Sequence, residues 1–324
     1  MEIVELINGK RSVTRWVDEA GTYGSLPATG LIPLKNAVVS PNAVQVWEPV
    51  LGSADGTITK TYIAGVKDIK FNIDYNPQTW RLLVMAIGYT DNVDETGHYS
   101  HTYALKTNLN LESFSLQVID NHTTDIVTTY TGCKFNSFDI SWNSAGGGTG
   151  KFIKCVGEVL CRDVSYTETE KTVEASPTTL ALLQSRQVVL TVNNDATKYV
   201  RCLSGNIRFD NDLDDGWYSN AAVSTARTEN DRQSLTISGK FVLRYTDKTD
   251  MTLFAAGAAI SNTQVEFRRT VTTDTAIFAF GNFRIVKASS PTKLGGFNEM
   301  TIEYLADTCL PEITDDRDDY YSTS

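Results

Sequence analysis

The residues of this 324-residue chain whose types could do chemistry are three histidines and a run of aspartates. His98 and His101 form an HxxH pair close to Glu95, and these are residue types that bind zinc. His122 is the remaining histidine, however, and no helical HExxH pattern surrounds the pair. We therefore expect polar residues at the entrance of a strand, and no metal site.

The second candidate is the run DNDLDDG at residues 210–216, whose aspartates have the spacing of a calcium loop. Its glycine comes one position late, and the twelfth position is Ala221 where such a loop needs a glutamate. A solvated turn before Trp217 is the expectation. The glycines at 146–148 separate two predicted strands, so they predict a hairpin turn and not a phosphate-binding loop.

Nucleophilic catalysis finds no support, because the sequence has no GxSxG and no Cys–His or Ser–His–Asp grouping. Its five cysteines are an odd number without a CxxC pair, which predicts buried, reduced thiols and no disulfide framework. Cys155 and Cys161 could bridge only if the chain turns between them. The sequence predicts neither an enzyme nor a cofactor. The cysteines are Cys133, Cys155, Cys161, Cys202 and Cys309.

Charge and hydropathy exclude further classes. The 29 basic and 39 acidic residues give a net charge of -10, which argues against a protein that grips nucleic-acid phosphates. No apolar run approaches the ~18 residues of a membrane span, and the N-terminus has acids where a signal peptide has bases. We expect no membrane insertion by this chain and synthesis in a cytoplasm.

The dominant pattern is a period-two alternation of apolar and polar residues, as at Phe138, Ile140 and Trp142, which predicts an all-β protein. Two helices interrupt it. One is predicted from an N-cap at Asn76 to a stop at Gly88, and the other over 246–257.

These two helices and the strands before them form a repeat. Residues 70–86 align without gaps on 240–256, with six of 17 positions identical. We interpret this as a tandem duplication, with units at 1–165 and 186–310, a linker at 166–185 and an acidic tail at 311–324. The repeat predicts equivalent core positions in the two units: Phe71, Tyr75, Leu83 and Ala86, and Phe241, Tyr245, Leu253 and Ala256.

The first unit carries an extra segment at 18–66, with six glycines and four prolines, which we predict to be a long loop. Its isolated apolar residues favour a loop that docks on a neighbouring subunit. We predict that Trp47, Val50 and Ile58 take part in assembly.

The order of these elements, with the segments HYSHTYAL, SFSLQV, YTGCKFNSFDISW, NIRFDNDLDDG and SLTISGKFVLRYTD, resembles the tail tube (major tail) proteins of long-tailed bacteriophages and related archaeal viruses. The resemblance covers nearly the whole chain. It implies two tandem β-sandwich units, each with one flanking helix, that close into rings which stack into a hollow tube for genome delivery.

The family also implies partners. Tandem members close a homotrimer with pseudo-sixfold symmetry, other tail proteins bind at the tube ends, a tape-measure protein occupies the lumen, and viral DNA passes without specific binding. The chain would be assembled in the host cytoplasm and reside in the virion tail. Two other readings stay open: another viral structural role, such as a head-completion or decoration protein, and a carbohydrate-binding β-sandwich.

Overall fold

The chain is nearly all β-structure in the computed structural model, as the alternating pattern predicted. None of the helices in the described part of the chain is long and apolar enough to cross a membrane. The structure describes residues 12–19, 23–54, 57–95, 98–105, 111–120, 125–144, 152–174, 180–193, 202–214, 231–244, 259–269, 274–289 and 299–315.

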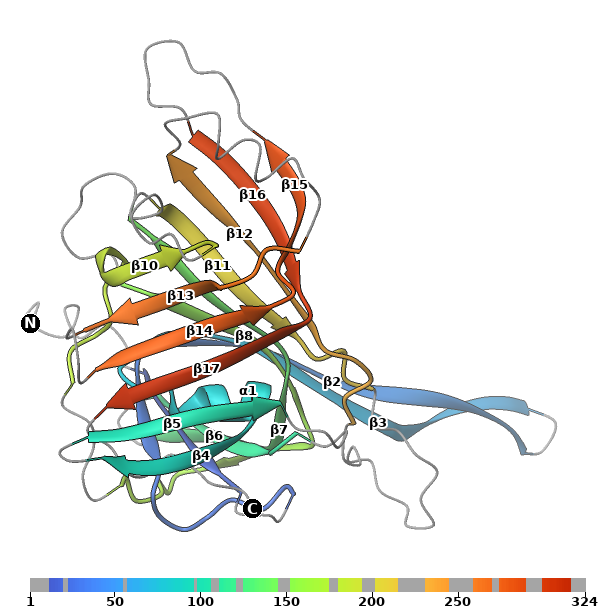
Figure 1. Cartoon of the computed structure of the whole chain (residues 1–324). Coiled ribbons are helices and arrows are strands. Elements are labelled where there is room, and N and C mark those ends of the chain that lie inside the picture. The colour runs from blue at the N-terminus through green and yellow to red at the C-terminus, as the bar shows by residue number, and fades with distance from the viewer. Residues whose placement is uncertain are drawn as a thin grey trace, which may run out of the picture.

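Strands account for almost every element (Figure 1). In the first half they are β1 (Ser12–Asp18), β2 (Ile32–Ala54), β3 (Thr57–Asn76), β4 (Gly88–Glu95), β5 (His98–Leu105), β6 (Phe114–Asp120), β7 (Ile126–Asn143), β8 (Lys154–Cys161) and β9 (Asp163–Thr167). In the second half they are β10 (Val188–Thr191), β11 (Cys202–Asp210), β12 (Thr236–Arg244), β13 (Thr263–Arg268), β14 (Thr275–Gly281), β15 (Arg284–Ser289), β16 (Glu299–Ala306) and β17 (Thr308–Asp315).

The first predicted helix is present but shorter than expected. A 3-10 turn at Arg81–Leu83 leads into α1 (Val84–Ile87), and Gly88 is its C-cap as predicted. Asn76 is not the N-cap, because its side chain donates a hydrogen bond to the carbonyl of Ile153 (2.7 Å) and so secures the end of β3. The second predicted helix lies outside the described residues, and so do the predicted core positions Tyr245, Leu253 and Ala256.

The larger sheet has 11 strands, in the order β15-β16-β12-β11-β7-β6-β1-β2-β3-β8 with β9 on β7. Because β8 also pairs with β7, the strands β7, β6, β1, β2, β3 and β8 close into a barrel. β9 pairs with the first half of β7. The other strands extend from the barrel through β11, which pairs with the second half of β7 from Ser137 to Asn143.

The smaller sheet has six strands in the order β10-β13-β14-β17-β5-β4, and it packs on the extension of the larger sheet (Figure 1). Aromatic side chains fill the space between the sheets, with ring centroids 5.5 Å apart for Trp142 and Phe267 and 5.4 Å apart for Phe280 and Tyr304. The two halves of the chain therefore share both sheets.

The predicted core positions that the structure describes are all buried: Phe71, Tyr75, Leu83, Ala86 and Phe241. Phe71 and Tyr75 of β3 and Phe241 of β12 lie at positions whose side chains point inward, because side chains alternate between the two faces of a strand. Phe71 pairs with Val159 of β8, and Phe241 pairs with Ile302 of β16.

Three sequence predictions need correction. The predicted loop at 18–66 is wrong over most of its length, because residues 32–54 and 57–66 belong to the long hairpin of β2 and β3. The acidic tail cannot begin at 311, because residues 311–315 belong to β17. Part of the predicted linker packs on the body, because Leu183 is buried and Val173 forms a parallel bridge with Leu31, whereas residues 166–170 are exposed.

A buried carboxylate secures the chain after β1. Both oxygens of Glu19, which is 2% exposed, accept two hydrogen bonds each at 2.6–2.7 Å. The donors are the hydroxyls of Ser113 and Ser115 and the backbone N–H groups of Gly24 and Gly132. One side chain thus joins the end of β1 to β6 and β7.

Gly239 of β12 sits where no side chain fits. A methyl group on its Cα would meet the carbonyl oxygen of Asn206 on β11 and the ring of Tyr304 on β16. We expect Gly239→Ala to lower the free energy of unfolding by about 1–3 kcal/mol, since β12 must shift away from β11. Urea denaturation measures this loss. The outward-facing neighbour variant Ser238→Ala should leave the urea midpoint unchanged, and an equal midpoint for both variants would contradict the assignment.

Buried tyrosines make the fold sensitive to alkali. Burial raises the pKa of Tyr75, Tyr103 and Tyr304 well above the ordinary value of 10.0, and that of Tyr130 to about 12. Below pH ~10 both folded and unfolded chains keep these protons, so this contribution to stability is complete. Above pH ~10 the unfolded chain loses them first, and stability falls by about 1.4 kcal/mol per pH unit for each such tyrosine.

Thermal melts from about pH 8 to 11 test this expectation. Tyr304→Phe should give a shallower fall of Tm with pH than the wild type, because one titrating group is removed. The exposed Tyr166, at 69% exposure, offers the control Tyr166→Phe, whose pH dependence should stay much closer to that of the wild type, because this variant changes only the charge near Tyr130. Parallel curves for all three proteins would refute the role of Tyr304.

Candidate assembly surfaces

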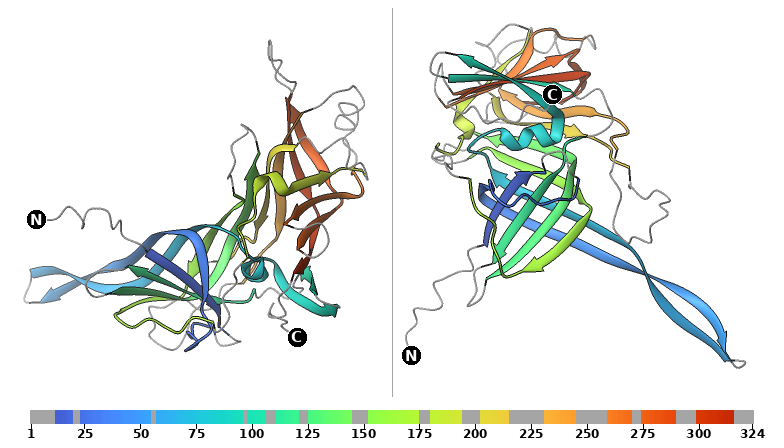
Figure 2. Two further views of the ribbon diagram at one scale, coloured as in Figure 1. Left: turned by 90° about the vertical axis from the view of Figure 1, so that its left-hand side faces the viewer. Right: turned by 90° about the horizontal axis from the view of Figure 1, so that it is seen from below.

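The most prominent surface is the hairpin of β2 and β3, which projects far beyond the body (Figures 1 and 2). Near the body its strands are flanked, since β2 pairs with β1 at Ile32–Leu34 and β3 pairs with β8 at Ile69–Tyr75. From Val44 to Asp68 the pairings of the described residues are only those between β2 and β3. We call this outer part, 44–54 with 57–68, the ribbon; it extends about 35 Å at ~3.3 Å per residue.

All three residues predicted to take part in assembly lie in the ribbon. Trp47 and Val50 belong to β2, where they pair with Ala64 and Thr61 of β3, and Ile58 pairs with Ser53. A two-stranded ribbon alone in water is marginally stable, because it buries little apolar surface. Both of its outer edges offer backbone N–H and C=O groups to another strand.

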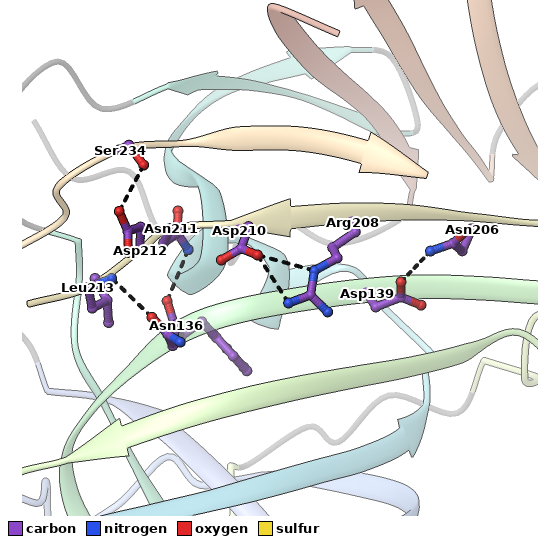
Figure 3. Close-up of polar contacts among 10 residues, drawn as sticks. Asn136, Asp139, Asn206, Arg208, Asp210, Asn211, Asp212, Leu213 and Ser234 are labelled. Carbon is purple, nitrogen blue, oxygen red and sulfur yellow. Dashed lines mark hydrogen bonds and ion pairs between the residues drawn. The ribbon is translucent and has the colours of Figure 1, made fainter. Parts of the chain in front are cut away.

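The seam between the two halves of the chain is held by side chains of β7 and β11 (Figure 3). The amide of Asn206 on β11 donates a hydrogen bond to the carboxylate of Asp139 on β7. Burial raises the pKa of Asp139, and the Asn206 hydrogen bond and the charges of Arg208 and Lys240 oppose that rise. Arg208 in turn donates to Asp210 at 3.1 Å. Acidic and basic side chains therefore lie next to each other along this seam.

The acidic run at the end of β11 is not the solvated turn that the sequence predicted, because its residue Asn211 is buried and hydrogen-bonded to other elements. Asn211 is fully buried, and its amide donates to the carbonyls of Ala86 (2.9 Å) and Phe135 (3.0 Å). Asp212 accepts a hydrogen bond from Ser234, as Figure 3 shows. Groups of three or more potential metal ligands are absent from the residues that the structure describes.

A second seam joins β5 of the first half to β17 of the second. The two strands pair from Tyr99–Asp315 to Thr102–Glu312. His101, predicted at the entrance of a strand, lies inside β5 and is fully buried, with Nε2 3.2 Å from a carboxylate oxygen of Asp315. This histidine therefore contacts the second half of the chain across the β5–β17 pairing.

One end of the larger sheet is an open edge. β15 pairs with β16 on one side and has no partner among the described residues on the other. Five of its six residues are exposed, including Val286 at 62%. The exposed Leu305 of β16 adds apolar area at the same edge of the sheet. An edge of this kind accepts a strand from a neighbour.

A hollow of about 670 Å³ lies on the exposed face of the larger sheet. Most of the residues that line it are polar, among them Asp139, Ser141, Lys154, Asn206 and Lys240. Phe152 is the more exposed of its two aromatic residues, at 39%. Carbohydrate recognition usually stacks a sugar on an open aromatic face, and this lining offers only that one partly open ring.

Comparison with known proteins identifies a family for this chain. The sequence model of a family described as phage tail tube protein matches residues 68–305, well over half of the chain. This span begins at the base of the ribbon and includes most strands of both sheets and the seam of β7 with β11, whereas β1, β2 and β17 lie outside it. None of the curated proteins compared matches the chain.

Proposed function

The chain belongs to the phage tail tube protein family, and from this premise we propose that it oligomerises into stacked rings that form a hollow viral tail tube. The tube is the conduit for the genome into the host cell. The family is structural, so the chain acts by assembly and not by catalysis. The sequence resemblance to tail tube proteins is confirmed by the family match.

The observation that carries the proposal is the ribbon. Its residues form a long hairpin that pairs with no other strand of the described chain and leaves the body entirely (Figure 2). Because such a hairpin is marginally stable alone, its length is explained when a neighbouring subunit packs on it. Trp47, Val50 and Ile58 would then contact an adjacent subunit or the next ring.

The ring would be a trimer with pseudo-sixfold symmetry. Support comes from the repeat, whose equivalent strands β3 and β12 each pair antiparallel with a later strand: β3 pairs with β8, and β12 pairs with β16. Two similar units in each of three subunits place six similar strands around the lumen. The proposed first unit keeps the boundaries 1–165, and the second begins at 186 and runs to the end of β17 at Asp315.

Passage of DNA requires weak binding. Three subunits would carry about 3 × -10 = -30 charges per ring, and a wall of like charge does not hold a polyanion. We expect the assembled protein to retain no duplex DNA in a filter-binding assay at physiological ionic strength. Other tail proteins would bind the tube ends and a tape-measure protein would fill the lumen during assembly in the host cytoplasm.

Negative-stain electron microscopy of the purified chain over a range of concentrations tests the proposal. Hollow tubes or stacked rings, with threefold or apparent sixfold end views, are the expected result. Single rings that never stack would instead favour a head-completion or decoration protein. Monomers at every concentration, together with binding in a glycan screen, would favour the carbohydrate-binding reading and overturn the tube.

A further inference from the structure

Two of the five cysteines meet inside the barrel. Cys133 lies in β7 and Cys161 ends β8, and their Sγ atoms are 3.0 Å apart. Both side chains are fully buried, and both are free thiols. Two sulfur atoms at this distance are closer than an ordinary contact between unbonded sulfurs, so the side chains point at one another.

The backbone register explains the meeting. Thr131 pairs with Asp163 on one side of the cysteines, and Lys134 pairs with Leu160 on the other. Continuing this antiparallel ladder puts Cys133 directly opposite Cys161. Residues opposite each other on neighbouring strands have Cα atoms about 4.5–5.5 Å apart, which lies within the range that a disulfide spans.

The other three cysteines have different surroundings. Cys155 forms a hydrogen bond with Tyr75, and Cys202 donates to the carbonyl of Ser204 at 3.4 Å. Cys309 lies opposite Phe280 of β14. Among the five, which all lie in the described residues, only Cys133 and Cys161 are recorded in contact with each other.

We propose that Cys133 and Cys161 form an intramolecular disulfide when the protein meets a small-molecule disulfide oxidant such as oxidised glutathione. The thiolate of one cysteine attacks a glutathione sulfur, breaks its S–S bond and releases one glutathione. The second cysteine then attacks the mixed disulfide and releases the other. Two cysteine protons and two electrons thus pass to one oxidant molecule, which leaves as two reduced glutathiones.

The bond would close the barrel covalently. Cys133 pairs with Phe114 of β6, and Cys161 pairs with Ile69 of β3, so the cross-link would lie where β7 and β8 complete the ring of strands. Burial raises the pKa of the Cys133 thiol well above its ordinary value. Because the thiolate is the reacting form, the bond forms slowly in the folded chain and faster when the barrel opens transiently. The disulfide proposal rests on the proposed function in one respect only: a virion leaves the reducing cytoplasm and so meets an oxidant.

Thiol counting and peptide mapping test the proposal on the purified full chain. After incubation with oxidised glutathione in dilute urea, removal of glutathione and denaturation, Ellman's reagent should detect three thiols instead of the five in reduced protein. Trypsin should then give one disulfide-linked pair of peptides, 107–134 with 155–162. The alternative bridge between Cys155 and Cys161 would stay within the single peptide 155–162, and finding it would overturn the proposal.

Two variants complete the test. Cys133→Ala should keep all of its four thiols, whereas the matched control Cys309→Ala should fall from four to two. The oxidised wild type should melt roughly 5 °C higher than the reduced protein, and a reducing agent should reverse the shift. Five thiols after oxidation would refute the disulfide. Neither readout depends on tube formation, so failure here leaves the proposed tube untouched and failure of the tube leaves the disulfide.

Discussion

Shortening the ribbon is expected to abolish tube formation without unfolding the subunit. The variant replaces residues 46–66 with Asn-Gly, which joins Gln45 to Lys67, a pair of residues already opposite each other in β2 and β3. Asn-Gly is a favoured two-residue turn for this connection. The barrel keeps the pairing of β3 with β8 over Ile69–Tyr75, so the fold survives. The neighbour, however, loses the surface on which we propose that it packs.

The measurement is electron microscopy at ten times the concentration at which the wild type forms tubes, together with a thermal melt. We expect no tubes and a Tm within a few degrees of the wild type. Val38→Ser serves as the control, because Val38 is an exposed β2 residue at 59% exposure that lies outside the ribbon. Tubes of normal length from the shortened chain would exclude the ribbon from assembly. A triple variant, Trp47→Ala with Val50→Ala and Ile58→Ala, then tests whether these residues supply the contact.

The largest loss of subunit stability is expected from Glu19→Ala. Removing this carboxylate leaves four donors without their acceptor: the buried hydroxyls of two serines, the buried N–H of Gly132 and the half-buried N–H of Gly24. Each unpaired buried donor costs its desolvation free energy, although relaxation of the loop recovers part of the total. We expect the free energy of unfolding to fall by about 3–5 kcal/mol, the range seen when one partner of a buried charged network is removed.

Urea denaturation gives the loss, and two further variants make it interpretable. Glu19→Gln keeps the shape but can accept with one oxygen only, so it should be intermediate and remains measurable if the alanine variant does not fold. Glu168→Ala removes an exposed carboxylate and should change stability by less than about 0.5 kcal/mol. Equal midpoints for Glu19→Ala and Glu168→Ala would show that the hydrogen bonds of Glu19 contribute nothing.

The β-structure was predictable where one face of a strand is buried. Phe138, Ile140 and Trp142 alternate with polar residues in the sequence, and all three face the core of the structure. The start of the first helix was not predictable in this way. Asparagine is a common N-cap residue, but the side chain of Asn76 bonds to the carbonyl of Ile153 instead. Ile153 is distant in the sequence, so no local pattern reveals this hydrogen bond.

The hairpin of β2 and β3 was missed because the prolines and glycines of residues 18–66 suggested a loop. Pro41 and Pro49 lie within β2, and proline is tolerated in a strand where its missing N–H has no partner to lose. The useful signal was the Asp55–Gly56 dipeptide, a favoured hairpin turn, followed by alternating threonines from Thr57. This pattern predicts two strands joined by a turn, and it is a stronger signal than the number of prolines.

The seam between β5 and β17 was beyond sequence reasoning. His101 and Asp315 are more than two hundred residues apart, and each strand would satisfy the same alternation beside another partner. Only packing of the whole chain selects this pairing. The residues of the seam therefore carried no signal, and His101 attracted interest for metal chemistry that its position inside a strand does not support.

That seam also sets a timetable for biosynthesis. While the chain leaves the ribosome, the edge of β5 next to β17 is complete long before residues 308–315 exist. At 5–20 residues per second, the roughly 200 intervening residues need about 10–40 s. Throughout this interval the nascent protein presents an unsatisfied strand edge, a target for chaperones and for mispairing. Only the finished polypeptide covers this edge, so translation itself determines when a subunit becomes fit to join its neighbours.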